Sequence, residues 1–440
     1  MSDSRLATEK ERVPCLGAGE GGAASMAGPR RNLALDALMA CWGLGTWLGV
    51  NGLYVQLPLL VDRLPEGWTL PASMVVAVQL ANVGLLAYML LKRLRPGGSD
   101  SHYIYGLLAV GALALLLNAF LYERTVVVRG TERSVAFLAL TFFAALVGCT
   151  SSVLFYPYLR HFRDVYLVTF LVGEGLSGFV PAILALGQGI GGDPECVPTA
   201  DNATMVEVTP PPRFDSTVFM AVLGALGALS LVSFVLIDRL SAFASERVAP
   251  GAAAKDEEAT ATPAELLSAR WLGAMTLMGA LNALMNGVLP SVQTYSCKPY
   301  GGRAYHLAVT LGALANPAAC LAGVWLRPLP TRALAALLAG ALPPLGYILA
   351  TALLSPAPPL QHSAGGVFLV VAVWVFVSGA VSYARMWVYG WARRGGARGM
   401  RACGASTQLG SALGSLLLYA LVGYTGLFRQ PQPCAARLAY

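Results

Sequence analysis

The chain of 440 residues is 56% hydrophobic and only 12% charged, and it carries a formal net charge of +7. Because soluble domains contain roughly 25% charged residues, this composition and a mean hydropathy of +0.61 exclude a water-soluble globule of this length. The lysines and arginines lie in short segments between apolar runs, as in membrane proteins, rather than in a patch suited to nucleic acid. We therefore expect a protein that lies in the lipid bilayer and has no nucleic-acid partner.

Eleven apolar segments follow one another along the chain, and each is about long enough to cross the ~30 Å hydrocarbon core of a bilayer as a helix. They are residues 33–61, 71–91, 103–122, 135–158, 166–190, 216–237, 271–296, 304–326, 333–354, 365–389 and 402–424. We expect an all-α membrane protein with a six-helix bundle over 33–237 and a five-helix bundle over 271–424. Residues 1–32 lack the apolar core of a signal peptide and predict a disordered tail. Residues 238–270 predict a linker, and 425–440 a second tail.

The distribution of positive charge predicts the orientation. With the N-terminus inside, the segments on the inner side hold 20 lysines and arginines, and those on the outer side hold 9. Inner loops are enriched in these residues, so we expect the N-terminal tail and the linker to be cytoplasmic and the C-terminal tail to be extracellular. Asn202 then begins an outer Asn-Ala-Thr glycosylation acceptor. Cys196, Cys297 and Cys434 also fall outside, which allows one disulfide among them without naming its pair.

An internal repeat relates the first five apolar segments to the last five. Asn51-Gly52 resembles Asn286-Gly287, and each is followed within seven residues by a proline and a glutamine. Three pairs of polar positions are equivalent, namely Asn51 and Asn286, Asn82 and Asn316, and Glu174 and Gln408. Glu174 lies 92 residues beyond Asn82, and Gln408 lies 92 residues beyond Asn316. Equivalent segments cross in the same direction, so the halves are predicted to form a parallel, major-facilitator-like repeat. Such carriers hold substrate near mid-membrane, between the halves.

Polar side chains in segment 271–296 fall on one stripe of a helix. At 100° per residue, Asn282, Asn286 and Gln293 lie within roughly 60° of one another. Two interpretations are open, namely a face that lines a cavity and a set of amides that join neighbouring helices. We favour the cavity, because joining helices rarely needs three amides on one stripe.

The first segment carries polar residues on opposite faces of its helix. They are Trp47, Asn51 and Tyr54 on one face and Gln56 on the other. The two amides cannot reach one ligand from a straight helix. Pro58 removes a helical hydrogen bond and Gly52 tolerates a bend, so we expect a kink near one of them. The alternative is a glycine face that packs on a neighbouring helix, with Asn51 bonded internally.

Glu174 is the one acid deep inside an apolar segment. An intramembrane acid is a candidate proton carrier or polar ligand, and a protonated, purely structural carboxyl is the alternative. His306, at the start of segment 304–326, is a candidate ligand contact, although a lone histidine near an interface is more often structural. The chain has no CxxC pair and no Walker A, HExxH or GxSxG motif. We therefore expect no metal, no cofactor and no enzymatic activity.

Several long runs resemble the animal riboflavin transporter family of solute carriers. They are Asn51-Gly-Leu-Tyr-Val-Gln-Leu-Pro58, Leu64-Pro-Glu-Gly-Trp68, Phe170-Leu-Val-Gly-Glu-Gly-Leu-Ser-Gly178, Asn286-Gly-Val-Leu-Pro-Ser-Val-Gln-Thr-Tyr-Ser-Cys297 and Ala304-Tyr-His-Leu-Ala308. The resemblance implies an eleven-span plasma-membrane carrier that takes up riboflavin by alternating access, without a sodium gradient. Riboflavin is then the transported substrate rather than a cofactor.

The polar inventory suits riboflavin, because amides donate and accept at its uracil-like edge and aromatic rings stack on its flat ring system. The candidate substrate-binding residues are Trp47, Asn51, Tyr54, Gln56, Asn82, Glu174, Asn282, Asn286, Gln293, Tyr295, His306, Asn316 and Gln408. Gln56 stands where family members carry Glu, and a glutamine cannot exchange a proton. Glu174 therefore becomes the proton-coupling candidate.

The resemblance also leaves some points open. The loop Ser355-Pro-Ala-Pro-Pro lacks a cysteine that we associate with this family, so a disulfide from that loop to the C-terminal cysteine does not carry over. A carrier of nucleosides or related heterocycles is one alternative function, and a cell-surface receptor that does not transport its ligand is another. We expect the protein to act as a monomer.

Overall fold

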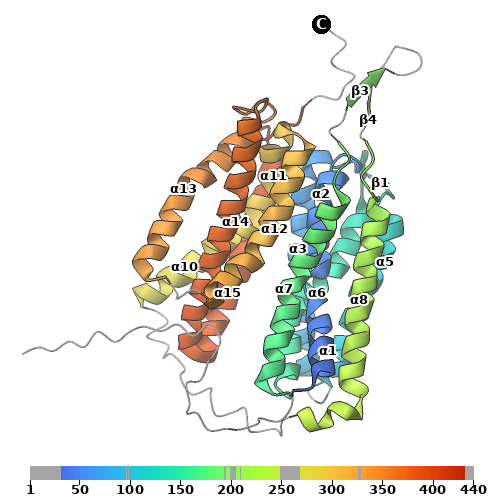
Figure 1. Cartoon of the computed structure of the whole chain (residues 1–440), viewed down its shortest axis with the longest axis vertical. Coiled ribbons are helices and arrows are strands. Elements are labelled where there is room, and N and C mark those ends of the chain that lie inside the picture. Colours follow the sequence, from blue (N-terminus) through green and yellow to red (C-terminus); the bar gives the residue numbers. More distant parts are fainter. Residues whose placement is uncertain are drawn as a thin grey trace, which may run out of the picture.

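The computed structural model describes residues 31–95, 97, 99–192, 195–198, 205–208, 210–247, 268–325 and 329–431. These residues form a nearly all-helical bundle with two short β-hairpins at one end (Figure 1). The predicted glycosylation acceptor Asn202 and the predicted outer cysteine Cys434 lie outside the described residues.

The first half of the chain begins with a broken helix and continues with long ones. Its helices are α1 (Leu33–Leu44), α2 (Leu48–Leu60), η1 (Gly67–Thr69), α3 (Leu70–Leu80), α4 (Val83–Leu94), α5 (Asp100–Leu121), α6 (Val135–Leu159), α7 (Asp164–Gln188), α8 (Ser216–Arg239) and η2 (Ser241–Glu246). Its strands are β1 (Val126–Val128), β2 (Thr131–Arg133), β3 (Glu195–Pro198) and β4 (Met205–Val208). β1 pairs antiparallel with β2, and β3 with β4.

The second half repeats the pattern of a broken first helix followed by long ones. Its elements are α10 (Ala269–Ala283), the π-helical turn η4 (Leu284–Val288), α11 (Leu289–Cys297), η5 (Lys298–Tyr300), α12 (Gly302–Trp325), α13 (Thr331–Leu353), α14 (Ala364–Ala392), η6 (Arg393–Gly395) and α15 (Gly396–Tyr424).

The predicted membrane-spanning segments coincide with these elements. In the described part of the chain, nine helices are long and apolar enough to cross a bilayer, and the bent pair α1 and α2 raises the number to ten. α12, with 24 residues, is a further long helix outside that count. A multi-span, all-helical membrane protein is therefore confirmed, whereas the number of eleven spans stays a prediction.

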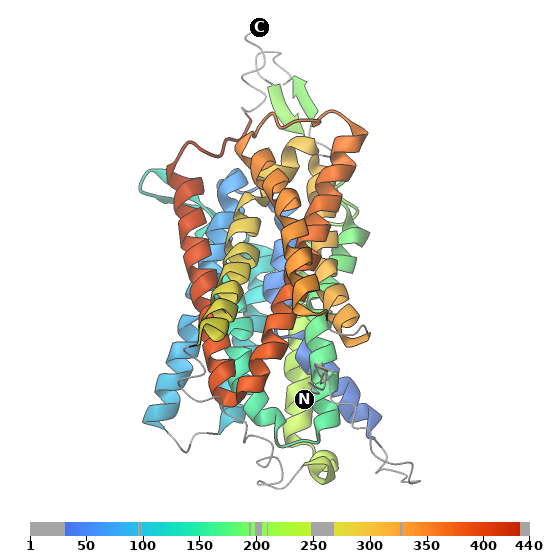
Figure 2. The same ribbon diagram turned by 90° about the vertical axis from the view of Figure 1, so that its left-hand side faces the viewer.

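The described chain starts and finishes at opposite ends of the bundle. α1 begins at what we call the α1 end, and α15 finishes near the β-hairpins, at what we call the hairpin end (Figure 2). An odd number of crossings produces this arrangement, which agrees with the predicted topology.

Glycines bring the first and fifth segments of each half into close contact. A Cβ built on Gly43 of α1 would lie 2.2 Å from the carbonyl oxygen of Phe170 in α7. In the second half, a Cβ on Gly410 of α15 would lie 2.0 Å from the carbonyl oxygen of Gly279 in α10. Small residues allow this backbone approach in membranes, where helices gain little from apolar burial. Equivalent helix pairs thus use the same kind of contact, as a parallel repeat predicts.

The first segment bends, but not at the predicted place. α1 and α2 meet at 53° across a short break, whereas α2 runs through Gly52 and ends two residues after Pro58. A Cβ on Gly45, in the break, would lie 2.2 Å from Ser230 Oγ, and this hydroxyl donates to the Trp42 carbonyl oxygen at 2.8 Å. The predicted kink is therefore wrong, because contact with α8 sets the break closer to the start of the segment.

Candidate functional site

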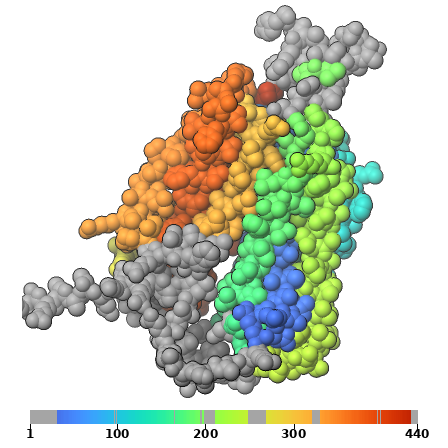
Figure 3. Space-filling model, in the orientation of Figure 1, coloured from blue at the N-terminus to red at the C-terminus, as the bar shows by residue number. Residues whose placement is uncertain are grey.

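The two halves of the chain face each other through two sets of helices. α2, α3 and α7 belong to the first half, and they contact α11, α12 and α15 of the second. Figure 3 shows the green α7 and the light orange α12 in contact in the upper part of the view. Because substrate sites of repeat-built carriers lie at such an interface, its polar side chains are the candidates for a substrate site.

At the hairpin end, an ion pair and a ring contact join the halves. Lys298 Nζ pairs with the Asp62 carboxylate, and these side chains are only 9% and 18% exposed. The ring centroids of Trp68 and Tyr295 lie 5.6 Å apart, and the Phe428 ring lies 5.4 Å from that of Tyr295. These contacts close the halves against each other at this end.

Toward the α1 end the helices of the two halves diverge (Figure 1), and polar side chains between them are accessible. Asn316 of α12 is exposed, although it lies about 180° round the helix from the exposed Leu307. Gln408 of α15 is exposed about 100° away from the exposed Leu409 and about 140° away from the exposed Leu413. Since the exposed leucines mark the lipid-facing sides, the two amides line a space between the halves.

Asn286 occupies the π-helical turn η4. Its Nδ2 donates to Asn282 Oδ1 at 3.3 Å and to Ser411 Oγ at 3.0 Å, and its carbonyl oxygen accepts from Ser415 Oγ at 3.2 Å. The side chain is only half-buried, and its Oδ1 makes no hydrogen bond within the described residues. Single π turns occur frequently at functional sites. Asn286 is therefore both anchored and able to accept a hydrogen bond from a ligand.

Asn282, by contrast, is fully buried. It donates to the Met278 carbonyl oxygen at 2.8 Å and to Thr407 Oγ1 at 3.4 Å, so it joins α10 to α15. Gln293, beyond the π turn, is half-buried. Because the π turn interrupts the α-helix, the angle about the helix axis between Asn286 and Gln293 differs from the one expected for a regular α-helix. The three amides therefore do not form one simple stripe.

Glu174 of α7 lies where the broken first segment meets α6. Tyr156 donates to Glu174 Oε2 at 3.0 Å, and Trp47 is a second hydrogen-bond partner of the carboxyl. The Trp47 ring packs on Gly148 of α6, where an added Cβ would lie 2.6 Å from the ring. Tyr389, from the second half, lies close enough to interact electrostatically with Glu174. The acid is thus held by aromatic donors at the boundary between the halves.

Both amides of α2 contact α7, although they lie on different faces of their helix. Asn51 Nδ2 donates to Ser177 Oγ at 3.4 Å, and its side chain is half-buried. Gln56 is fully buried and donates to Gln188 Oε1 at 2.6 Å. The Gln56 Oε1 has no partner within the described residues. Asn51 is therefore partly accessible, whereas Gln56 is enclosed within the first half.

The other predicted residues are spread along the interface. Asn82, between α3 and α4, donates to the Gln79 side chain at 3.2 Å. Tyr54 packs against the main apolar core of the bundle. His306 is buried and is hydrogen-bonded to the backbone of Ala185, so it connects α12 to α7. The interface therefore holds more polar groups than one ligand can contact.

Sequence reasoning missed three partners of the predicted residues. Tyr156 and Tyr389 accompany Glu174, and Thr407 accompanies Asn282. A single tyrosine or threonine in an apolar segment gives no signal, because its role depends on which helix packs beside it.

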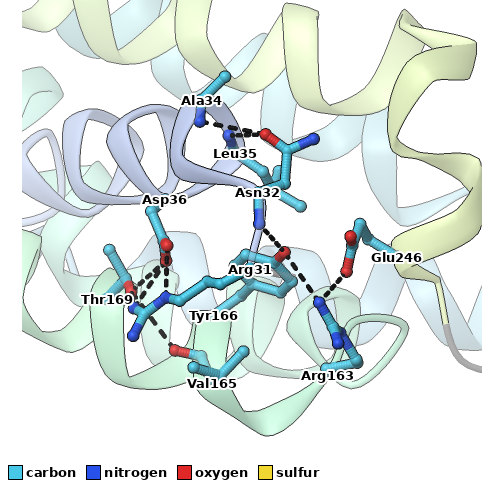
Figure 4. Close-up of polar contacts among 10 residues, drawn as sticks. All are labelled: Arg31, Asn32, Ala34, Leu35, Asp36, Arg163, Val165, Tyr166, Thr169 and Glu246. Atoms are coloured by element: carbon cyan, nitrogen blue, oxygen red, sulfur yellow. Dashed lines mark hydrogen bonds and ion pairs between the residues drawn. The ribbon is translucent and has the colours of Figure 1, made fainter. Parts of the chain in front are cut away.

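A polar network fixes the α1 end of the first half (Figure 4). Arg31 pairs with Asp36 of α1, and Thr169 of α7 donates to Asp36 Oδ1 at 2.7 Å. Arg163, just before α7, pairs with Glu246 of η2. The network ties α1, α7 and η2 together within one half, which supports movement of that half as a unit.

Metal and cysteine chemistry contribute little to the described part of the chain. No group of three His, Cys, Asp or Glu side chains there is arranged to hold a metal ion. Cys196 is disulfide-bonded, whereas Cys297 is buried and free. Cys297 is therefore excluded from the predicted outer disulfide, and Cys434, the remaining candidate, is not described.

The fold and the site together define a class of protein. Many apolar helices form two related halves that are closed against each other at one end, and accessible amides and an acid lie between them. This is the architecture of a membrane transporter for a small solute.

The chain belongs to solute carrier family 52, the riboflavin transporters, as the sequence resemblance predicted. The family model described as "Solute carrier family 52, riboflavin transporter" matches residues 31–430. The chain is 38% identical over 464 residues to solute carrier family 52, riboflavin transporter, member 3 of Homo sapiens, which covers 91% of this chain and 98% of that protein. It is 36% identical over 459 residues to riboflavin transporter 2 of Salmo salar, with the same coverage.

A solved structure shares a distant likeness. It is a bacterial homologue of the human lysosomal transporter Spinster, in an inward-facing and occupied conformation, with a TM-score of 0.41 and 11% sequence identity over 91% of this chain and 98% of that chain. This likeness is too weak to carry an argument.

Proposed function

We propose that this protein carries riboflavin across the plasma membrane into the cell and binds it between the two halves, near mid-depth. Family membership supports the choice of substrate. Asn286 carries the proposal for the site, because its half-buried amide is anchored to α15 while its side-chain oxygen is left unpaired within the described residues. Such an oxygen suits the N–H of the uracil-like edge of riboflavin.

The ligand contacts come from both halves. Asn51 and Glu174 belong to the first half, and Asn286, Asn316 and Gln408 belong to the second. All five side chains are half-buried or exposed, so each can exchange water for a ligand. Aromatic side chains stack on or border the ring system, with Trp47 directly before α2 and Tyr54 within it. Tyr295 of α11 borders the pathway at the closed hairpin end. Asn82, Gln293 and His306 extend the polar lining along the pathway.

Two of the candidate residues act indirectly. Gln56 and Asn282 are fully buried, and their amide nitrogens are committed to Gln188 and to Met278 with Thr407. We assign them as positioning residues for α2 and for the π turn, not as ligand contacts.

The transport cycle follows from the closed hairpin end. With the N-terminus in the cytoplasm, the hairpin end is extracellular and the present conformation is accessible from inside. Uptake then requires the halves to rock so that Asp62 separates from Lys298 and Trp68 from Tyr295. We propose that a monomer performs this cycle without sodium.

Glu174 is the proposed proton-exchanging group of the site. A glutamine at this position keeps a hydrogen-bond acceptor for Tyr156 but cannot take up or release a proton. We therefore expect Glu174→Gln to flatten the dependence of riboflavin uptake on external pH, while Tyr156→Phe keeps it. Initial uptake rates at a series of external pH values provide the measurement. An unchanged profile in Glu174→Gln would remove Glu174 as proton carrier.

Uptake into cells tests the proposed function. Cells that express the protein should accumulate radiolabelled riboflavin saturably, both in sodium medium and after replacement of sodium by choline. Unlabelled riboflavin should compete, and uridine should not. Competition by uridine alone would assign the protein to nucleoside-like substrates instead.

A further inference from the structure

A cavity lies at the hairpin end, away from the proposed riboflavin site. Its volume is about 120 Å³, and its lining comes from the end of η1, α3, the end of β2 and the last turns of α15. The lining residues with polar side chains are Thr69, Ser73, Arg133, Tyr419 and Tyr424. The cavity is large enough for more than one water molecule. It is smaller than the ~300 Å³ of the smallest typical drug-sized pockets, so it is too small for riboflavin.

Arg133 gives this cavity its chemistry. Its guanidinium makes no hydrogen bond or ion pair within the described residues, although Arg63, at the same end of the bundle, is paired with Glu123. The rings of Tyr419 and Tyr424 meet edge to face, with centroids 6.1 Å apart, so at least one of their two phenolic hydrogens stays available. An unpaired guanidinium beside a free phenol donor is suited to a phosphate oxyanion, which guanidinium groups bind through parallel N–H donors.

The surroundings of the cavity fit a membrane lipid. Leu409, Leu413 and Leu416 form an exposed stripe along α15, and Leu409 lies about 15 Å along the helix from Tyr419, about half the thickness of a hydrocarbon core. On α3, the exposed Leu80 lies on the same side as Ser73. Tyrosines at the ends of membrane helices sit at headgroup level. The cavity therefore lies at the depth of a headgroup, above an apolar seam that can hold an acyl chain.

We propose that this cavity binds the phosphate of a phospholipid from the leaflet on the hairpin side. The phosphate pairs with Arg133 and accepts from the free tyrosine hydroxyl, and an acyl chain lies along the seam between α3 and α15. α3 belongs to the first half and α15 to the second, so the bound lipid bridges the halves. It thereby stabilises the conformation that is closed at the hairpin end.

Lipid retention by the purified full-length protein tests the proposal. The protein is delipidated in detergent, incubated with phosphatidylcholine or with the phosphate-free digalactosyldiacylglycerol, and analysed by native mass spectrometry. Wild type should retain phosphatidylcholine but not the galactolipid. Arg133→Gln should retain about tenfold less phosphatidylcholine, the effect expected for loss of a charge-assisted hydrogen bond. Arg129→Gln, which removes the same charge from the turn of the same hairpin outside the cavity, should behave as wild type.

The outcomes that overturn the proposal are distinct. Equal phosphatidylcholine retention by Arg133→Gln and wild type would show that the guanidinium does not hold the lipid. Retention of the galactolipid at the level of phosphatidylcholine would show that the phosphate is not recognised. Binding of radiolabelled inorganic phosphate to lipid-free wild type, lost in Arg133→Gln, would assign the cavity to free phosphate. None of these readouts depends on riboflavin transport, so they test the lipid site independently of the proposed function.

Discussion

Replacing Asn286 by leucine is expected to weaken riboflavin binding by about ten- to hundredfold, because a buried polar edge of the ligand would lose its partner. Leucine has the same γ-branched shape as asparagine, so the π turn keeps most of its packing against α15. The measurement is the dissociation constant for riboflavin of the purified protein, together with the amount of protein at the cell surface. Surface expression should stay near the wild-type level.

Ser411→Ala is the matched control for Asn286. It removes the hydroxyl that accepts from Asn286 Nδ2 at 3.0 Å but leaves the amide in place. If the amide contacts riboflavin, Ser411→Ala should weaken binding several-fold less than Asn286→Leu. Near-normal binding by Asn286→Leu, or equal losses in both variants, would contradict a direct contact.

Reversing the charge of Asp62 is expected to lower riboflavin uptake about five- to tenfold, in the range of coupling energies between contacting residues. Asp62→Lys would oppose Lys298 across the hairpin end, where both side chains are largely shielded from water. The closed conformation would then be disfavoured, and the transport cycle slowed at that step. Initial uptake rates, normalised to surface protein, give the measurement.

The charge swap decides whether the pair acts as a closing contact. Asp62→Lys combined with Lys298→Asp restores attraction across the halves and should recover most of the lost rate. A double variant no better than Asp62→Lys alone would mean that the reversal damages something other than closure.

The course of the helices could be predicted from the sequence because long apolar runs dominate it. The broken first segment shows where such reasoning fails. Pro58 suggested a kink, but it lies in the last turn of α2, where the lost hydrogen bond changes the direction of the chain little. The actual break at Gly45 depends on Ser230, nearly two hundred residues away in the chain. No pattern within one helix contains that contact.

The candidate site was predictable in part, for a similar reason. The repeat singled out Asn51 and Asn286, and each is half-buried and donates to a serine in the fifth segment of its own half. Whether an amide faces a ligand or a neighbouring helix depends on tertiary contacts. Asn282 and Gln56 carry the same chemistry as their neighbours, yet they are fully buried. The π turn η4 adds a second uncertainty, since it breaks the 100° periodicity on which the predicted stripe rested.

Transport by the purified protein in vesicles tests the central claim most directly. Vesicles that contain only this protein and lipid should accumulate radiolabelled riboflavin against excess unlabelled riboflavin inside, as a carrier does by exchange. The Asn286→Leu variant, reconstituted at the same density, should show little of this exchange. Saturable riboflavin binding without any accumulation in the wild-type vesicles would contradict the account, because it would identify a receptor rather than a carrier.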